Sequence, residues 1–324
     1  MKVVVTDSTF PTLAIEEAIL SAAGVELIGG QCKTREDLRV LVADADAVIT
    51  QFAAVDSEVV AAMTKARVIV RYGIGVDNVD LDAARAKGIP VCNVPDYCID
   101  EVADHTMAFL LATTRQVLTN ATFIRQGKWG LATPLDRMFA LRDLTVGVVG
   151  YGRIGREVTA RLRAFKCRVL VHDPIVAAAE IERSGCVAVD LQTLLAESDA
   201  ITLHCPSTSQ TRGMLNRDAF ERMRPGVVII NVARGDLVDS AALTEALQQG
   251  RVSAAALDVF APEPVPADHP IRAMENVIVS SHIASASVPA VHKLRTTAAT
   301  LALAAIRGEP LRSVVNGVSK RREP

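Results

Sequence analysis

The segment Val146–Arg156 constrains the fold of this chain more than any other, because a short apolar run leads through three glycines into a helical pattern. Gly150, Gly152 and Gly155 have the spacing G-x-G-x-x-G between a strand and a helix, the context that gives this motif its meaning. The first glycine permits a tight turn, the second lets a pyrophosphate approach the backbone, and the third allows the helix to pack closely on the strand. The pattern predicts a parallel α/β sheet that binds a dinucleotide at a helix N-terminus.

A second strand is expected at 168–172 and is followed by Asp173. An acidic residue at this position, roughly 20 residues beyond the glycines, binds the hydroxyl groups of the adenosine ribose. A carboxylate there repels a 2′-phosphate, and neither Pro174 nor Ile175 offers a positive charge to neutralise one. The sequence therefore predicts NAD rather than NADP as the cofactor. The contacts expected from this motif are Gly150, Tyr151, Gly152, Arg153, Ile154, Gly155 and Asp173.

Composition limits the classes of protein to which the chain can belong. Its 324 residues suffice for two domains, half of them are hydrophobic, and the formal net charge is −2. There is no basic run beyond the short tail Lys320–Arg322 and no apolar run of membrane-spanning length, so we expect neither nucleic acid nor a membrane as a partner. The six cysteines form no C-x-x-C pair, which argues against a metal site or a disulfide framework. With no signal peptide or membrane-spanning run evident, we expect a cytoplasmic protein.

Two regions alternate between β-rich runs and helical periodicity, which predicts parallel sheets covered on both faces. In the first region, strands are expected at 3–5, 25–28, 47–49, 68–70 and 90–92, and helices at 14–23, 35–42, 57–65 and 81–87. In the second region, strands are expected near 145–149, 168–172, 200–203, 227–231, 253–257 and 277–280. An alanine-rich helix is expected at 287–307.

The segment between the two regions predicts a long helix followed by an arm. Asp100 to Leu118 has the pattern of one helix, with Asp100 as its cap and Glu101 in its first turn. Residues 120–141 contain the only tryptophan, Trp129, and lack periodicity, so we expect them to be irregular. A helix with such a wide apolar surface could link two domains or pack against a second subunit. A long arm without periodicity is typical of a dimer contact, although a plain surface loop is also compatible.

Polar segments follow several expected strands, at the sheet edge where ligands of parallel sheets bind. In the second region they are Leu203–Pro206, Asn231–Gly235, Leu257–Asp258 and Ser281–Ala284. In the first region Arg71–Asn78 follows a strand. Its glycines expose backbone N–H groups that suit a small carboxylate, or they merely reverse the chain.

Three of these side chains suit chemistry beside a nicotinamide ring. Arg234 offers a planar fork that matches a carboxylate, and His282 titrates near neutral pH and can move a proton. Glu263 can fix the tautomer of an imidazole. Spacing alone leaves open a surface arginine, a helix-entry glutamate and a core histidine. We expect the other histidines to be structural, with His204 the nearest of them to the cofactor.

Together these motifs resemble the D-isomer-specific 2-hydroxyacid dehydrogenase family. The resemblance covers nearly the whole chain and is carried by Arg71–Asp80, Gly150–Gly155, Asn231–Asp239, Leu257–Pro264 and Ser281–Ala284. It implies an NAD-dependent oxidoreductase that interconverts a small D-2-hydroxy acid and its 2-keto acid. By match with the family, Arg234 binds the substrate carboxylate, Glu263 orients His282, and His282 is the acid/base.

The resemblance implies further contacts. Asp258 is expected at the nicotinamide carboxamide. Substrate binding is expected from Arg71, Gly73, Ile74, Gly75 and Arg234. Cofactor contacts beyond the glycine turn are expected from His204, Cys205, Pro206, Val232, Ala233, Arg234, Asp258, His282 and Ser285. The candidate lining of the substrate pocket is Gln51, Phe52, Tyr72, Tyr97, Cys98 and Ser285.

The implied fold is α/β with two Rossmann-like domains. A flavodoxin-like, split substrate domain is expected at residues 1–99 plus 288–324. An inserted, doubly wound NAD-binding domain is expected at residues 100–287, with the dimerisation helix and arm. The family is usually dimeric through the NAD-binding domains, so we expect a homodimer.

Within the family several members remain open. Residues 91–104 resemble the C-terminal-binding-protein branch, so an NADH-sensing binding scaffold without catalytic activity is one alternative. That branch often has a tryptophan soon after the histidine, where this chain has Ser285–Ser287. Among substrates, 3-phosphoglycerate is possible because Arg71 could meet a phosphate, and glyoxylate or hydroxypyruvate needs only a small pocket. Formate oxidation fits less well, because that enzyme pairs its histidine with glutamine.

Overall fold

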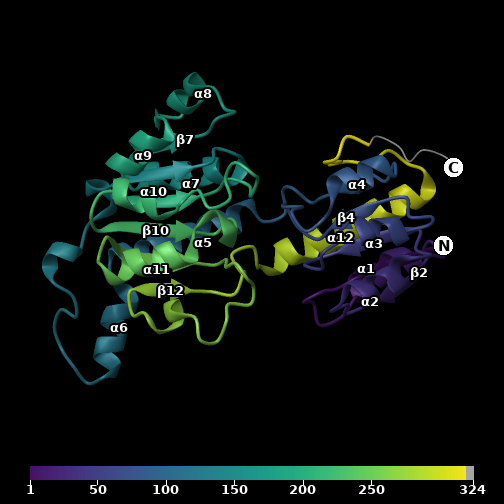
Figure 1. The fold of residues 1–324 in the computed structure, drawn as a ribbon, viewed down its shortest axis with the longest axis horizontal. Coiled ribbons are helices and arrows are strands. Elements are labelled where there is room, and N and C mark those ends of the chain that lie inside the picture. The colour runs from purple at the N-terminus through teal and green to yellow at the C-terminus, as the bar shows by residue number, and fades with distance from the viewer. Residues whose placement is uncertain (319–324) are drawn as a thin grey trace. The chain divides into compact units, whose positions relative to one another are not determined.

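The computed structural model describes residues 1–318 of the chain (Figure 1). The basic run Lys320–Arg322 lies outside the described residues. The chain divides into two compact units: a first unit of Met1–Tyr97 with the segment that begins at Ser287, and a second unit of Cys98–Ala286.

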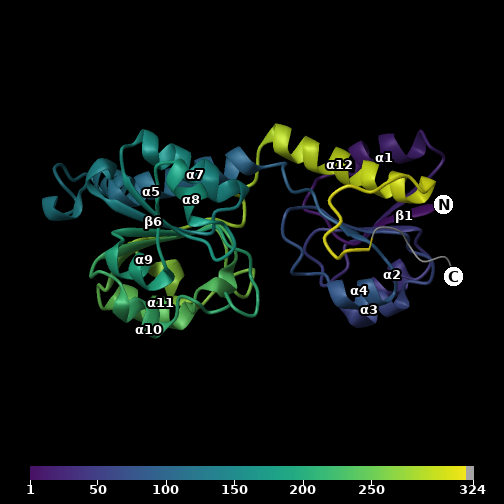
Figure 2. The ribbon, with the colours of Figure 1, turned by 90° about the horizontal axis from the view of Figure 1, so that it is seen from above.

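The first unit is built on a five-stranded parallel sheet in the order β2-β1-β3-β4-β5. Its strands are β1 (Lys2–Val5), β2 (Glu26–Gly29), β3 (Ala47–Thr50), β4 (Ile69–Arg71) and β5 (Val91–Cys92). Helices α1 (Ala14–Ser21) and α12 (Val288–Arg307) cover one face, and α2 (Arg35–Val42), α3 (Ser57–Ala62) and α4 (Leu81–Ala86) cover the other (Figure 2). This strand order is the flavodoxin-like one that the family resemblance implies.

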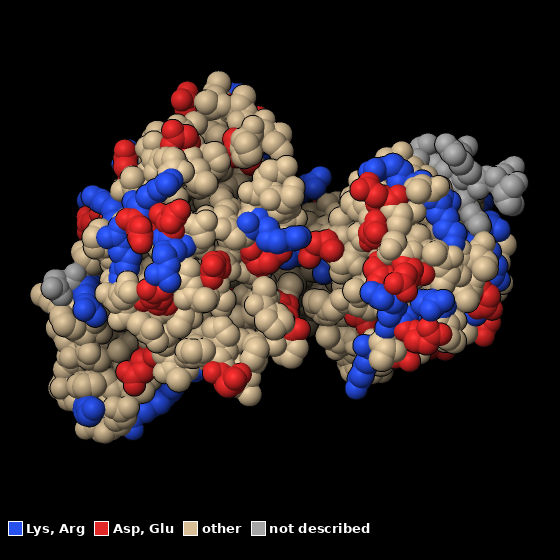
Figure 3. Space-filling model, in the orientation of Figure 1, with Lys and Arg blue, Asp and Glu red and all other residues tan. Residues whose placement is uncertain are grey.

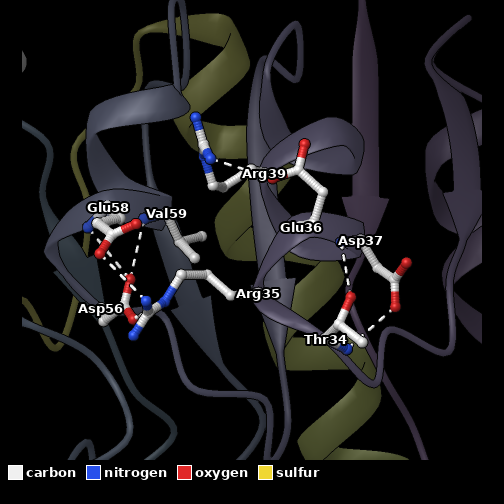
Figure 4. A network of polar contacts seen from close by, with 8 residues as sticks. All are labelled: Thr34, Arg35, Glu36, Asp37, Arg39, Asp56, Glu58 and Val59. Atoms are coloured by element: carbon white, nitrogen blue, oxygen red, sulfur yellow. Dashed lines mark hydrogen bonds and ion pairs between the residues drawn. The ribbon is translucent and has the colours of Figure 1, made fainter.

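Local signals explain where these helices begin. The Thr34 side chain accepts the Asp37 N–H while the Asp37 carboxylate accepts the Thr34 N–H, so α2 starts in a capping box. Asp56 caps α3 by accepting the N–H groups of Glu58 and Val59. The Asp56 carboxylate also accepts a hydrogen bond of 2.6 Å from Arg35 Nε, which links the starts of the two helices (Figure 4). Because this pair is exposed, it contributes little to the free energy of unfolding.

The second unit is built on a seven-stranded parallel sheet in the order β12-β11-β10-β9-β6-β7-β8. Its strands are β6 (Thr145–Val149), β7 (Arg168–His172), β8 (Val187–Ala188), β9 (Ala200–Leu203), β10 (Val227–Asn231), β11 (Val252–Leu257) and β12 (Val277–Val279). Helices α5 (Ile99–Thr114) and α7 (Arg153–Ala164) lie on one face of the sheet, and α9 (Leu191–Glu197), α10 (Arg217–Arg222) and α11 (Ser240–Gln248) on the other (Figure 2). The short α8 (Ala178–Arg183) precedes β8.

This order is doubly wound, with the chain reversing its direction of travel across the sheet between β6 and β9. The core between the strands and α9–α11 consists of aliphatic side chains such as Leu194, Ile229 and Leu243, each at most 1% exposed. The predicted fold class, two Rossmann-like α/β units, is confirmed. Strand β8 was not expected, because its two residues carry no periodicity.

The expected helix from Asp100 to Leu118 is wrong in both its cap and its length. Helix α5 begins at Ile99, and Asp100 lies in its first turn, where it accepts a hydrogen bond from Arg161. The helix ends at Thr114, and Gln116 adopts a left-handed φ of 52°, which the backbone of a right-handed helix cannot take.

The arm expected to be irregular over 120–141 is helical at its start, because α6 spans Val117–Arg125. The rest contains short 3₁₀ turns at Leu135–Arg137 and Leu141–Asp143. Trp129 is 91% exposed. Throughout residues 1–318, no helix is both long and apolar enough to cross a bilayer.

Candidate active site

The glycine turn between β6 and α7 has two positions where a side chain cannot fit and one where it can. A Cβ on Gly155 would lie 2.1 Å from the Gly150 carbonyl oxygen. Gly150 has a φ of +97°, and a Cβ there would lie 2.7 Å from the backbone of His204 and Cys205. A Cβ on Gly152 would meet nothing within 4 Å. Folding therefore requires Gly150 and Gly155, whereas the open space at Gly152 is what a phosphate needs to approach the backbone.

Donors and a carboxylate complete this turn. Within residues 1–318, the N–H groups of Arg153 and Ile154 at the start of α7 make no hydrogen bond, so the helix end offers them to an anion. The Asp173 carboxylate accepts the N–H groups of Tyr151 at 2.7 Å and Ile175 at 2.8 Å. Burial alone would raise the pKa of Asp173, but these hydrogen bonds lower it below its ordinary value. The turn thus fits a dinucleotide: donors for the pyrophosphate and an ionised carboxylate for a ribose.

The side chains that come directly after strands β9 and β10, beside this turn, carry no charge at neutral pH. His204 follows β9, its ring bonds Thr202 Oγ1 at 2.9 Å, and burial lowers its pKa to about 3. Burial raises the pKa of the neighbouring Cys205 thiol to about 11. Pro206 is exposed, Val232 is buried, and Ala233 is half-buried. None of these groups would repel a cofactor by charge at neutral pH.

His282 and Glu263 meet in the second unit, with His282 Nδ1 and Glu263 Oε2 2.8 Å apart. The other carboxylate oxygen accepts the Phe260 N–H at 2.8 Å, so the glutamate is held from both sides. Burial opposes ionisation of Glu263. Its pKa is nevertheless below the ordinary value, because His282 donates a hydrogen bond to it and because the charges of His282 and Arg234 stabilise the carboxylate. The structure therefore brings together the three side chains for which chemistry was predicted.

Asp258 holds the segment that carries the histidine. Its carboxylate accepts the N–H groups of Ile283 at 2.9 Å and Ala284 at 2.8 Å, and its carbonyl accepts the His282 N–H at 2.7 Å. Ser280 Oγ also donates to this carboxylate. His282 has a left-handed φ of 56°, which these bonds stabilise.

Sequence reasoning missed this anchoring of the His282 segment. The resemblance gave Asp258 only a cofactor contact, and Ser280 was not singled out. The Ser280 hydroxyl in turn lies 3.3 Å from His105 Nε2. Ser285, three positions beyond His282, is half-buried.

The loop after β4 lies in the first unit. A Cβ on Gly73 would lie 1.3 Å from Arg71 Nη1, so the Arg71 guanidinium packs directly against that glycine. Within residues 1–318, the N–H groups of Ile74 and Gly75 make no hydrogen bond. The loop therefore presents the two donors that a carboxylate would need.

Two residues of the expected pocket lining are engaged elsewhere in the first unit. Tyr72 is 1% exposed and its hydroxyl donates to Glu16, so its assignment to a pocket is wrong. Gln51 is buried and its side-chain amide bonds Thr9 on both the donor and the acceptor side. The sequence could not show either partner, because Glu16 and Thr9 are far from them along the chain. Phe52 is exposed, and Tyr97 and Cys98 stand where the first unit passes into the second.

The described residues offer little to a metal ion or a polyanion. Among the side chains that the structure describes, no group of three or more histidine, cysteine, aspartate or glutamate residues is arranged to hold a metal, and all six cysteines are free thiols. On the face shown in Figure 3, basic and acidic side chains are interspersed. That face therefore carries no single-sign surface of the kind that binds nucleic acid.

Fold and turn together define a doubly wound α/β protein with a dinucleotide-binding unit. Residues 107–284 match the model of the D-isomer specific 2-hydroxyacid dehydrogenase, NAD binding domain. The chain belongs to the D-isomer-specific 2-hydroxyacid dehydrogenase family. The predicted resemblance and the presence of an NAD-binding domain are thereby confirmed.

Named relatives agree with this family. The chain is 38% identical to a D-3-phosphoglycerate dehydrogenase of Archaeoglobus fulgidus over 93% of this chain and 57% of that protein. It is 36% identical to a glyoxylate reductase of Korarchaeum cryptofilum over 85% of this chain and 84% of that protein. A D-lactate dehydrogenase of Aquifex aeolicus, solved with NAD and lactic acid, superposes with a TM-score of 0.85 at 28% identity over 95% of this chain and 96% of that one.

The chain thus spans little more than half the length of the phosphoglycerate dehydrogenase that it resembles. The relatives are named as dehydrogenases and reductases, which gives no support to the alternative of a non-enzymatic scaffold.

Proposed function

We propose that this protein is an NAD-dependent oxidoreductase that interconverts a small D-2-hydroxy acid and its 2-keto acid. The observation that carries the proposal is the 2.8 Å contact between His282 and Glu263 in the unit that also holds the dinucleotide turn. An imidazole paired with a carboxylate is a proton carrier with a fixed tautomer. Membership of the family adds the reaction class.

In this mechanism each side chain has one task. A nicotinamide cofactor, which the glycine turn and Asp173 would hold, would supply or take up the hydride of the reaction. Protonated His282 donates to the keto oxygen from Nε2, and in the reverse direction the neutral ring accepts the hydroxyl proton. Glu263 holds Nδ1–H and stabilises the positive ring with its own negative charge. Arg234 binds the substrate carboxylate through its planar fork.

The remaining predicted contacts enter as proposals on the same basis. The glycine turn and Asp173 bind the cofactor and favour NAD over NADP, and Asp258 contacts the carboxamide while it anchors the His282 segment. The loop Gly73–Gly75 binds the substrate carboxylate through the N–H groups of Ile74 and Gly75. Free cysteines support a cytoplasmic location.

Two substrate classes are supported by separate observations. A relative named glyoxylate reductase, matched over most of its length, supports a small unphosphorylated acid. A relative named D-3-phosphoglycerate dehydrogenase, together with Arg71 beside the loop, supports a phosphorylated acid. We favour the small unphosphorylated acid, because Arg71 is buried and packed against Gly73.

The test is NADH oxidation with a panel of glyoxylate, hydroxypyruvate, pyruvate, phenylpyruvate, 3-phosphohydroxypyruvate and phosphonopyruvate, with NADPH in parallel. We expect turnover of one of the unphosphorylated acids and a preference for NADH. Preference for a phosphorylated or phosphonate acid would reverse our choice of substrate class. Tight NADH binding with no turnover of any acid would contradict the proposed activity.

A further inference from the structure

A buried polar cluster lies directly behind the proposed carboxylate-binding loop. It consists of Glu16 on α1, Tyr72 at the end of β4 and Arg295 on α12, which are 0%, 1% and 6% exposed. Tyr72 immediately precedes Gly73, so the cluster is joined covalently to the loop. The mechanism above uses none of these three side chains, and only Tyr72 lies within a motif that carries the family resemblance.

Glu16 is the centre of this cluster. Its Oε1 accepts hydrogen bonds of 2.8 Å from both Tyr72 Oη and Arg295 Nε, and its Oε2 accepts one of 2.6 Å from Arg295 Nη2. The pair is bidentate, and Arg295 Nη2 also donates to the Thr12 carbonyl at 2.6 Å. The Arg295 guanidinium stacks over the Phe10 ring, with 4.7 Å from Cζ to the ring centroid.

A buried charged cluster of this kind adds little to the free energy of unfolding when it joins two helices. A buried ion pair gains little over apolar side chains of the same volume, because both charges lose their hydration. Helices α1 and α12 already pack through apolar side chains such as Leu20, Leu294 and Ala298. Stability alone therefore does not explain why a charged pair lies here. The hydrogen bond from the Tyr72 hydroxyl to Glu16 connects this pair to the loop.

The loop is fixed at both of its ends. Tyr72 N donates to the Thr50 carbonyl at 2.8 Å, and its hydroxyl is held by Glu16. On the far side, Val94 N donates to the Gly73 carbonyl at 2.9 Å and Asn93 Nδ2 to the Ile74 carbonyl at 2.6 Å. These bonds use the loop's carbonyls and leave the N–H groups of Ile74 and Gly75 to a ligand.

We propose that Glu16, held by Arg295, is a positioning residue that sets the loop Gly73–Gly75 for the substrate carboxylate through the Tyr72 hydroxyl. The inference rests on the proposed function, since that function supplies the carboxylate. It adds a role for the C-terminal helix α12, whose Arg295 neutralises the buried glutamate. The tyrosine remains protonated and able to donate, because burial and the nearby carboxylate raise the pKa of Tyr72.

The variant Tyr72→Phe isolates this link, because it deletes one hydroxyl and leaves the Glu16–Arg295 pair and the ring packing in place. The matched control is Met63→Ala, a cavity variant of a fully buried side chain in the core on the other face of the same sheet. Amide hydrogen exchange of the peptide that covers residues 71–77 measures the loop in the absence of any ligand. We expect faster exchange there in Tyr72→Phe and in Glu16→Gln, and an unchanged rate in Met63→Ala.

Steady-state kinetics then test the link to the substrate. For the best 2-keto acid of the panel, we expect KM to rise about three- to tenfold in Tyr72→Phe, with kcat and the KM for NADH within about twofold. Met63→Ala should lower Tm without changing KM. The double variant Tyr72→Phe/Glu16→Gln should raise KM no further than Glu16→Gln alone, because both act through one hydrogen bond.

The outcomes of these experiments distinguish the positioning role of Glu16 from the proposed function. Unchanged exchange of residues 71–77 in Tyr72→Phe, or faster exchange with an unchanged KM, would overturn the positioning role. If the wild-type protein turned over no acid, the proposed function would fail. Faster loop exchange in the two variants would then still support the structural link.

Discussion

At the scale of single residues, His282 shows how the site depends on groups outside the reacting set. Its left-handed backbone is uncommon for a residue with a Cβ and costs about 1 kcal/mol or more. Three hydrogen bonds from the segment to Asp258 offset that cost. The aspartate thereby fixes the direction of the imidazole before any ligand arrives, and Glu263 fixes the tautomer.

Replacing Glu263 with glutamine should remove most of the activity while leaving the fold intact. The amide has one acceptor oxygen, so it either faces the Phe260 N–H with its NH2 group or donates to His282 Nδ1 and favours the ring tautomer that carries its proton on Nε2. A neutral amide also cannot stabilise a protonated ring. We expect kcat to fall by about 10²-fold or more.

Affinity for NADH and Tm should change little in Glu263→Gln, and both can be measured on the same sample. Glu182→Gln, at an exposed glutamate, is the matched control. A wild-type kcat in Glu263→Gln would show that the pair has no role in proton transfer.

His204 should make the protein sensitive to acid. Its pKa is about 3 in the folded protein, against about 6.5 in the unfolded chain, so between these values the unfolded state binds one more proton. Stability that is present above pH ~6.5 is therefore lost as the pH falls, by up to about 2 kcal/mol between pH 7 and pH 5.

Urea unfolding of His204→Gln at pH 7 and pH 5 tests this prediction. The variant should lose less of its free energy of unfolding between the two pH values than the wild type. Equal losses in the two proteins would mean that His204 titrates normally.

At the scale of elements, the sequence reveals those features that are local in the chain. The glycine spacing and the alternation of β runs locate both sheets, and the alanine-rich pattern at 287–307 locates α12. The break after Thr114 was not visible, because it depends on a left-handed Gln116 that apolar periodicity does not encode. The pairing of His282 with Glu263 could be predicted only from the family resemblance, because 19 positions separate the two residues in the sequence.

The glycine turn yields a prediction that separates folding from binding. Gly155→Ala should lower Tm, because its Cβ would collide with the Gly150 carbonyl, which is backbone and cannot move aside. Gly152→Ala should leave Tm nearly unchanged, since the φ of −73° suits alanine and the space is open. We expect its Kd for NADH to rise about tenfold or more, because the methyl group occupies the path of the pyrophosphate.

Tm by calorimetry and Kd by fluorescence titration measure the two effects independently. An unchanged Kd in Gly152→Ala would contradict the assignment of this turn to the cofactor.

At the scale of the whole molecule, we propose that α6 and the arm form a homodimer contact. Large apolar side chains are exposed along this stretch: Val117, Leu118, Ile124, Trp129, Leu131, Leu135 and Phe139. Large apolar side chains that are exposed together in one segment favour an interaction site there. The proposal agrees with the expected dimerisation through the NAD-binding domain and names the segment that forms the contact.

Sedimentation velocity tests this proposal. The wild-type protein should sediment as a dimer, and Trp129→Asp/Leu135→Asp should shift it towards monomer with an unchanged circular dichroism spectrum. Val40→Asp, at a site 70% exposed in the first unit, should leave the dimer intact. A monomeric wild-type protein, or a double variant that remains dimeric, would rule out this contact.

The proposed mechanism depends above all on His282 as the proton carrier in a hydride transfer. We would compare kcat and the Kd for NADH in His282→Ala, with His292→Ala at an exposed histidine as control. We predict that kcat falls by about 10²- to 10⁴-fold in His282→Ala, that its Kd for NADH stays within about twofold, and that the control matches the wild type. Near-normal turnover of the preferred acid by His282→Ala would contradict the account.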